Sequence, residues 1–126
     1  EIDLEQVTAR LSTLEPATPI GVALLDQRVA AGIGNVYKSE TLWACGVDPF
    51  TPIEAIAPDT RRELYATAAR LLRANLDTPF ERRTVAEGLA VYDRAARPCR
   101  RCGTPIECRR QGDQGRNTWW CPACQT

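Results

Sequence analysis

Four cysteines near the carboxyl end restrict the fold of this chain more than any other feature. They form two Cys-x2-Cys pairs separated by eighteen residues, a spacing typical of a tetrahedral zinc site. The chain contains no histidine, so the four ligands can only be thiolates. Because four protein ligands leave no coordination position for water, such a site is structural. We expect one Zn²⁺ bound by Cys99, Cys102, Cys121 and Cys124.

Two disulfides, or a redox-active Cys-x2-Cys pair, would use the same residues. Disulfides are typical of exported chains, but the first residues, EIDLEQVTAR, are acidic and do not read as a signal peptide. A thioredoxin-type pair requires a βαβ context, which the sequence does not indicate. The pattern therefore favours zinc. Of the two remaining cysteines, Cys45 is expected to be a small core residue, and no role is predicted for Cys108.

The segment between the two cysteine pairs predicts a β-hairpin. The stretches GTPIECRR and RNTWW flank a turn, QGDQG, as two short strands would. Four thiolates on one Zn²⁺ leave a net negative charge, to which Glu107 and Asp113 add. Six arginines outweigh that charge: Arg97, Arg100, Arg101, Arg109, Arg110 and Arg116. The hairpin is therefore a candidate phosphate binder, and the alternative is a solvated arginine-rich face.

Charge is unevenly distributed along the chain, although the formal net charge is zero. Residues 1–60 hold three basic and nine acidic side chains, a net of −6, whereas residues 61–126 hold thirteen and seven, a net of +6. Fifteen of the sixteen basic residues are arginine, whose planar fork suits bidentate contacts to phosphate. The pattern indicates a nucleic-acid partner, and the alternative explanation is the arginine bias of a GC-rich genome.

Apolar periodicity and breaker residues predict a mainly α fold for residues 1–96. The first two expected helices cover residues 3–14 and the stretch from Pro19 to the glycines of GIG. A third covers residues 35–45, with Asn35 as the N-cap and Gly46 as the C-terminal stop. The last runs from a Thr60-x-x-Glu63 capping box to about Leu76. Residues 77–98 are expected to form an irregular link, and residues 97–126 a separate zinc-bearing hairpin. No apolar run approaches the roughly 18 residues of a membrane helix, so no membrane contact is expected.

The stretch GIGNVYKSE, residues 32–40, places two glycines directly before an expected helix. Glycine permits a positive φ and a close approach to the backbone. Backbone N–H groups at such a turn, together with the positive end of the following helix, form an anion site. Gly34 would supply an N–H, Asn35 an amide donor and Lys38 a charge. The alternative is an ordinary helix corner in which glycine permits close packing.

Three stretches together carry a family resemblance: LLDQRVAAGIGNVYKSETLWACGVDPFTP, VYDRAARPCRRCGTPI and GRNTWWCPACQ. They resemble the carboxy-terminal half of the formamidopyrimidine-DNA glycosylase / endonuclease VIII family, from about residue 18 to residue 125. The resemblance implies a helix–two-turns–helix domain followed by a zinc finger. It also implies that Asn35 and Arg116 grip the phosphate beside a flipped nucleotide, that Gly34 offers its N–H, and that Tyr92 contacts the DNA backbone. A further basic position of the finger would be Arg110, or would fall at Cys108 if the gap is placed differently.

The resemblance also implies an activity for the parent protein. Family members excise oxidised bases and cleave abasic sites through a Schiff base on an amino-terminal proline. This chain begins with EID and contains no methionine, so we expect a DNA-binding half without glycosylase or lyase activity of its own. The interval TPFERRTVAEGLA is short for a formamidopyrimidine-type member and resembles the endonuclease VIII branch, which favours oxidised pyrimidines.

The expected partner is double-stranded DNA with a damaged or abasic nucleotide. We also expect contacts with other repair proteins, a monomeric state and a cytoplasmic, nucleoid-associated location in a bacterium. Two other readings stay open at this point. The chain could be a stand-alone zinc-hairpin module that binds nucleic acid or repair proteins without catalysis, or a zinc ribbon that binds only proteins.

Overall fold

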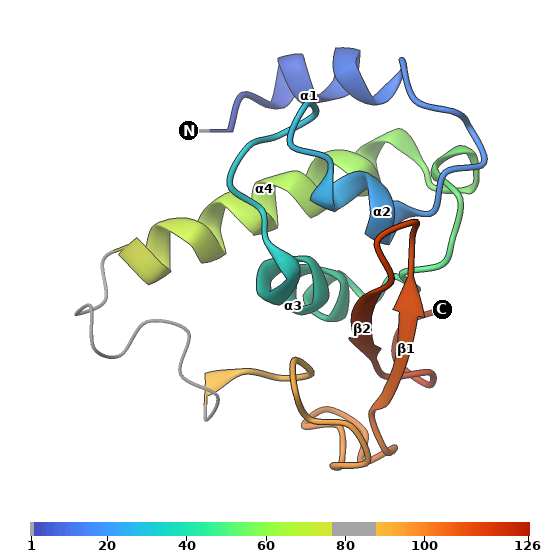
Figure 1. The fold of residues 1–126 in the computed structure, drawn as a ribbon. Coiled ribbons are helices and arrows are strands. Elements are labelled where there is room, and N and C mark those ends of the chain that lie inside the picture. The colour runs from blue at the N-terminus through green and yellow to red at the C-terminus, as the bar shows by residue number, and fades with distance from the viewer. Residues whose placement is uncertain (1, 77–87) are drawn as a thin grey trace.

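The structure is a computed structural model that describes residues 2–76 and 88–126. It confirms a mainly helical fold that ends in a small two-stranded antiparallel hairpin (Figure 1). The helices are α1 (Leu4–Leu11), α2 (Ile20–Leu25), α3 (Asn35–Cys45) and α4 (Pro58–Leu76), with a 3₁₀ turn at Ile53–Ala55. The strands are β1 (Glu107–Gln111) and β2 (Arg116–Trp120).

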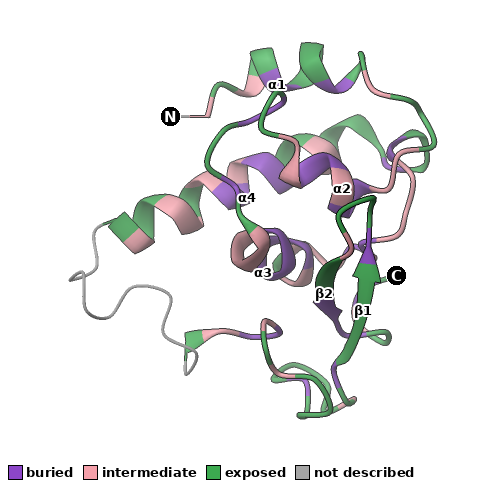
Figure 2. Ribbon diagram, in the orientation of Figure 1, coloured by how far each residue is buried: buried purple, intermediate pink, exposed green. Residues whose placement is uncertain are grey.

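Helix α3 occupies the centre of the molecule. It packs against α2 and α4 on one side and against β2 on the other (Figure 1). The main apolar core lies among the helices, and Ile20, Leu24, Leu42 and Leu64 are completely buried within it. Figure 2 shows that the buried segments of α2, α3 and α4 face one another, whereas the outer faces of α1 and α4 are exposed. The helical core therefore fixes the position of α3.

One expected helix start and one expected N-cap were wrong. Helix α4 begins at Pro58 and not at a Thr60-x-x-Glu63 capping box. Proline fits the first turn of a helix because backbone N–H groups there make no hydrogen bond within the helix, so the lack of one costs nothing. Helix α3 begins at Asn35, and Gly34 occupies the N-cap position that was predicted for Asn35. Its expected end at Gly46 is confirmed, since that glycine is left-handed with φ 70°.

Helix α2 ends earlier than the sequence predicts. It stops at Leu25 because the carbonyl of Asp26 accepts the N–H groups of Val29 and Ala30 and so forms a separate turn. A second turn follows at the glycines, so two turns join α2 to α3, as the resemblance implied. Of the expected irregular link, residues 89–98 form bends and turns, and residues 77–87 lie outside the described residues.

The predicted hairpin is confirmed, and its antiparallel register runs from Glu107 opposite Trp120 to Gln111 opposite Arg116. It contributes to a second apolar cluster that contains Ala90, Val91, Cys99, Ile106, Trp119 and Cys121, with Trp43 of α3 packed against it. Within the described part of the chain, no helix is both long and apolar enough to cross a bilayer.

Candidate metal centre and nucleic-acid interface

The four predicted ligand cysteines come together at the base of the hairpin. Their Sγ atoms all lie within 4.8 Å of one another. The Sγ atoms of Cys99 and Cys124 are 3.8 Å apart, and those of Cys102 and Cys121 are 3.5 Å apart. A tetrahedron with Zn–S bonds of about 2.3 Å has sulfur–sulfur edges of about 3.8 Å. The four thiols therefore fit a tetrahedral metal ion, and zinc itself stays a prediction.

Hydrogen-bond donors surround these sulfur atoms. The backbone N–H of Arg101 and the indole N–H of Trp43 point at Cys99 Sγ, with donor–sulfur distances of 3.4 and 3.3 Å. The N–H of Cys124 lies 3.3 Å from Cys121 Sγ. Burial opposes the thiolate at Cys99, but the bonds from Trp43 and from backbone N–H groups outweigh burial and lower its pKa to about 6. Metals bind the thiolate form, which these donors favour at Cys99.

The side chain of Gln27 holds the glycine turn in place. Its Oε1 accepts the N–H of Gly32 at 2.8 Å, and its Nε2 donates to the carbonyl of Ile33 at 3.0 Å. Gly32 has φ +99°, a conformation that side chains rarely adopt. Gly34 differs: its φ of −96° suits any residue, and nothing lies within 4 Å of the position a Cβ would take. Neither conformation nor packing requires a glycine at Gly34.

The amino end of α3 meets the hairpin directly beyond this turn. Asn35 Nδ2 donates to the carbonyl of Asn117 at 2.8 Å, across 82 positions of sequence. An amide nitrogen carries two hydrogens, so one donor remains after this bond. The neighbouring Arg116 is exposed, and the first N–H groups of an α-helix have no partner within the helix. The contact thus brings an amide and free backbone donors to Asn117, the neighbour of Arg116 in β2.

Lys38 lies in the interior of this junction and is completely buried. Its Nζ donates to Thr118 Oγ1 at 2.7 Å and lies 3.4 Å from the carbonyl of Asn117. Burial first, and the positive charge of Arg116 second, lower the pKa of Lys38 to about 8. Lys38 therefore ties α3 to β2, a role that the sequence did not predict.

The buried side chain of Gln111 extends the same network across the hairpin. Thr118 Oγ1 donates to Gln111 Oε1 at 3.0 Å, and Gln111 Nε2 donates to the carbonyl of Pro49 at 2.8 Å. The hairpin is consequently held against the helical core on the side that carries Arg116.

Glu40 of α3 is a second buried residue whose role sequence reasoning missed. Its carboxylate accepts the backbone N–H groups of Ala90, Val91 and Tyr92 at 2.7, 2.9 and 2.9 Å. It thereby fixes the segment that leads into the cysteine module. The sequence held no signal for this role, because only the packing of α3 shows that the carboxylate is enclosed and must find several donors.

We expect Glu40→Gln to destabilise the fold by about 2 kcal/mol, because the new NH₂ group would face backbone N–H groups and leave buried donors without an acceptor. Urea denaturation measures the change. Glu63→Gln is the matched control, because Glu63 is exposed on α4 and its ion pair with Arg70 is mostly solvated; we expect less than about 0.5 kcal/mol there. Equal stability of Glu40→Gln and the parent chain would contradict the role given to Glu40.

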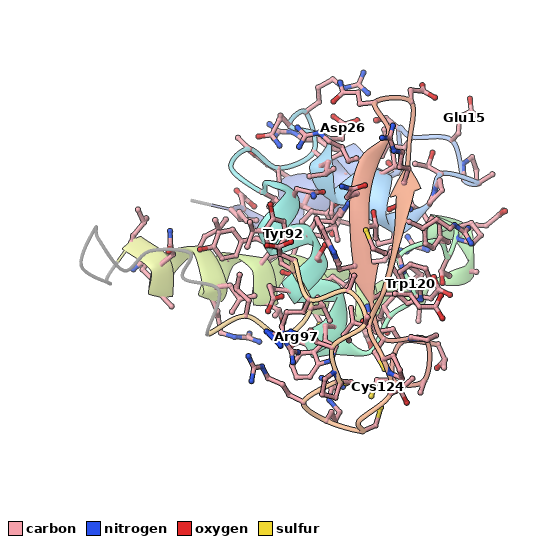
Figure 3. All side chains as sticks on the ribbon, turned by 60° about the horizontal axis from the view of Figure 1, so that its bottom comes forward. Glu15, Asp26, Tyr92, Arg97, Trp120 and Cys124 are labelled. Atoms are coloured by element: carbon pink, nitrogen blue, oxygen red, sulfur yellow. The ribbon has the colours of Figure 1, made fainter. Side chains whose placement is uncertain are left out.

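The other predicted interface residues lie on a different side of the hairpin. Side chains alternate between the two faces of a strand, so Arg110, which is paired with Asn117, points away from the face that carries Arg116. Tyr92 lies beside α3, with its ring 4.6 Å from that of Trp119 (Figure 3). The structure thus bonds Asn35, next to Gly34, and Lys38 to the part of β2 that follows Arg116. It places Arg110 on the opposite face of the hairpin and the Tyr92 ring against Trp119.

The two remaining cysteines lie away from the metal centre. Cys45 is half-buried against the helical core, with its Sγ 3.5 Å from Thr67 Oγ1, as expected of a small core residue. Cys108 is exposed on β1.

A hollow of about 470 Å³ borders the interface, between α2 and the tip of the hairpin. Arg28, Lys38 and Arg116 line it together with Asp26 and Asp113. Figure 3 labels Asp26 near the hairpin tip and Cys124 at the opposite end of the hairpin, so this hollow and the metal centre are well separated. Arg28 forms an ion pair with Asp26 at 2.7 Å, and Lys38 is completely buried, so among these side chains Arg116 is the cation that remains for a partner in this hollow.

Helices α2 and α3, with the two turns between them, form a helix–two-turns–helix unit. Side chains of α3 are hydrogen-bonded to the hairpin that carries the cysteine pairs. Residues 2–85 match the family described as the formamidopyrimidine-DNA glycosylase H2TH domain. The chain belongs to this family, which confirms the resemblance found in the sequence.

Similar proteins carry names from both branches of the family. The chain is 49 % identical over 115 residues to "Probable endonuclease 8 2" of Streptomyces coelicolor, covering 88 % of this chain and 42 % of that protein. It is 41 % identical over 124 residues to "DNA-(apurinic or apyrimidinic site) lyase Nei2" of Mycolicibacterium smegmatis, covering 96 % and 48 %. A complex of Lactococcus lactis Fpg with abasic-site DNA has the same fold, with a TM-score of 0.85 at 24 % identity over 99 % of this chain and 48 % of that one. The chain spans less than half the length of these proteins.

Proposed function

We propose that this chain is the DNA-gripping part of a base-excision-repair glycosylase and abasic-site lyase. The hydrogen bond between Asn35 and the carbonyl of Asn117 carries the proposal, because it places Arg116 beside the amino end of α3. The amide of Asn35, the N–H of Gly34 and the guanidinium of Arg116 then address one phosphate from two sides. Phosphate contacts of this kind position a protein on DNA without reading its sequence.

The glycine turn supports this proposal. Since Gly34 has an ordinary φ and open space around it, the absence of a side chain there suits the close approach of an outside group. A helix amino end favours anions through its free N–H groups and its dipole. A DNA phosphate fits both properties.

The proposed substrate follows from the family and not from the described residues. The Streptomyces and Mycolicibacterium relatives are named as an endonuclease 8 and an abasic-site lyase, and the Lactococcus protein was solved with abasic-site DNA. We infer a damaged or abasic duplex as the partner and, from the short interval before Val91, oxidised pyrimidines as the bases removed. Extruding a nucleotide costs a few kcal/mol, and a clamped phosphate beside it helps to offset that cost.

We assign the chemistry to an amino-terminal proline outside this sequence, and we infer that residues 1–126 bind DNA without cleaving it. Tyr92 and Arg110 are proposed to contact the DNA backbone from the other side of the hairpin. Lys38, which is buried, is proposed to act through the position of Asn35 and Arg116.

We propose Zn²⁺ as the metal, because four thiolates in a tetrahedron suit it, and a reducing cytoplasm as the setting, because the cysteines then stay reduced.

We expect Gly34→Ala to weaken binding to an abasic-site duplex about tenfold, or about 1.4 kcal/mol, while the melting temperature changes little. The added Cβ would stand where the phosphate approaches, and the backbone at this position already suits alanine. Fluorescence anisotropy on the full-length protein measures the affinity.

Gly32→Ala is the matched control from the same turn. Because Gly32 has φ +99°, alanine there is strained by about 1–2 kcal/mol, and we expect the melting temperature to fall by roughly 4–8 °C. A Gly34→Ala variant that binds as tightly as the parent would show that nothing approaches this turn closely.

A further inference from the structure

The carboxyl end of α3 contacts the metal centre, just as its amino end contacts the hairpin. Trp43 lies in the last turn of this helix, and its indole Nε1 donates to Cys99 Sγ at 3.3 Å. The ring packs against the second apolar cluster, which contains Cys99 itself. A single helix thus begins at the proposed phosphate site and ends at a predicted metal ligand.

Arg101 holds the indole in this position. Its guanidinium carbon lies 3.9 Å from the centroid of the Trp43 ring, and its Nη2 donates to the carbonyl of Trp43 at 2.8 Å. A cation over an aromatic face is attracted by the electron density of the ring. It draws that density away from the indole nitrogen, which makes the N–H a stronger donor to sulfur.

Hydrogen bonds also connect the second cysteine pair to the residues that directly follow α3. Gln125 is buried; its Oε1 accepts the N–H of Cys121 at 2.8 Å, and its Nε2 donates to the carbonyl of Val47 at 3.0 Å. The N–H of Thr126 donates to the carbonyl of Gly46 at 3.2 Å. The residues after α3 therefore contact one cysteine pair while Trp43 contacts the other.

We propose that Trp43 is a positioning residue of the metal centre, whose N–H orients and stabilises the Cys99 thiolate and so couples metal occupancy to the end of helix α3. Four thiolates around one divalent ion carry excess negative charge, and donors to the sulfur atoms disperse it. Hydrogen-bond partners of metal ligands fix the orientation of those ligands, and their loss typically weakens metal binding 10–100-fold. The proposal rests on metal binding by the four cysteines and does not depend on DNA.

The unmutated chain loaded with ¹¹³Cd²⁺ tests the proposal directly. A hydrogen bond to a metal-bound sulfur transmits a scalar coupling from the metal to the donor proton, and the chain has three tryptophans whose indole signals can be assigned by single substitution. We expect the Trp43 indole proton to show a coupling to cadmium. A loaded chain without that coupling would refute the role of Trp43, whereas a chain that takes up no cadmium would refute the metal site itself.

Substitution supplies a second, independent measurement. Trp43→Phe keeps an aromatic ring for Arg101 to stack on but removes the N–H donor. We expect about tenfold weaker Zn²⁺ binding in competition with a chromophoric chelator, and a shift of the sulfur-to-metal charge-transfer bands of the Co²⁺-loaded chain. Trp120→Phe is the control, because Trp120 packs edge-on against Phe50 at 5.2 Å; its zinc affinity should stay within about twofold of the parent. Zinc affinity and Co²⁺ bands in Trp43→Phe equal to those of the parent would overturn the proposal.

Discussion

Removal of the metal should unfold the hairpin and leave most of the helical core intact. The second apolar cluster contains two of the predicted ligands, Cys99 and Cys121, and an isolated two-stranded hairpin is at best marginally stable in water. The main core, in contrast, runs from Val7 to Ala68 and contains no residue of the cysteine module. Binding of a structural zinc is worth roughly 10 kcal/mol or more, which is the largest effect predicted for this chain.

A chelator or a Cys121→Ser substitution would remove the metal. Backbone NMR and far-UV circular dichroism then measure how much of the structure is lost. We expect the NMR amide signals of β1 and β2 to move to random-coil positions, while most of the helical circular dichroism signal is kept. The last turn of α3 should loosen with the hairpin, since Trp43 bonds to Cys99. Metal analysis of the purified protein is the necessary companion measurement. A hairpin that persists after chelation, or a metal-free protein with two disulfides, would contradict a metal-stabilised module.

Several features could be predicted because local sequence determines them. The two Cys-x2-Cys pairs predict a cluster of four sulfur atoms wherever the hairpin lies, and the structure places those atoms within 4.8 Å of one another. The turn QGDQG separates two strands whose pairing follows from the turn, and Gly46 ends its helix in the expected left-handed conformation. These signals involve residues that are neighbours along the chain.

Other features escaped prediction because their partners are distant in sequence. Glu40 bonds to N–H groups 50–52 positions away, Lys38 to Thr118 across 80 positions and Trp43 to Cys99 across 56. A polar residue on a helix is normally solvated, and only the packing of α3 between α4 and β2 shows that these side chains are enclosed. The misplaced N-cap at residue 35 and the misplaced helix start at residue 60 are a milder case, in which neighbouring capping positions compete.

The shared contacts of α3 explain how two small units can act on one ligand. Asn35 and Lys38 contact β2 near the amino end of the helix, and Trp43 contacts the metal centre near the other end. The hairpin is therefore held at two points, which fixes Arg116 relative to the glycine turn. A phosphate bound between them would find its donors already in place, so little conformational entropy would be lost on binding.

We expect Asn35→Ala and Arg116→Ala each to weaken binding to an abasic-site duplex by about 1–3 kcal/mol, the range for hydrogen bonds to charged groups. Because both side chains address one anion, the double variant should lose less than the sum of the single losses. Arg116→Ala should also reduce, by roughly one unit, the slope of the logarithm of affinity against the logarithm of salt concentration. Asn35→Ala removes no charge and should leave that slope nearly unchanged.

This double-mutant cycle, measured with the full-length protein at several salt concentrations, tests most directly whether the glycine turn and the hairpin hold one phosphate. A coupling energy clearly different from zero, with the salt effect confined to Arg116, is the predicted result. Strictly additive losses would assign the two residues to separate phosphates. Unchanged affinity in both single variants would contradict the account and leave the turn before α3 as a plain helix corner.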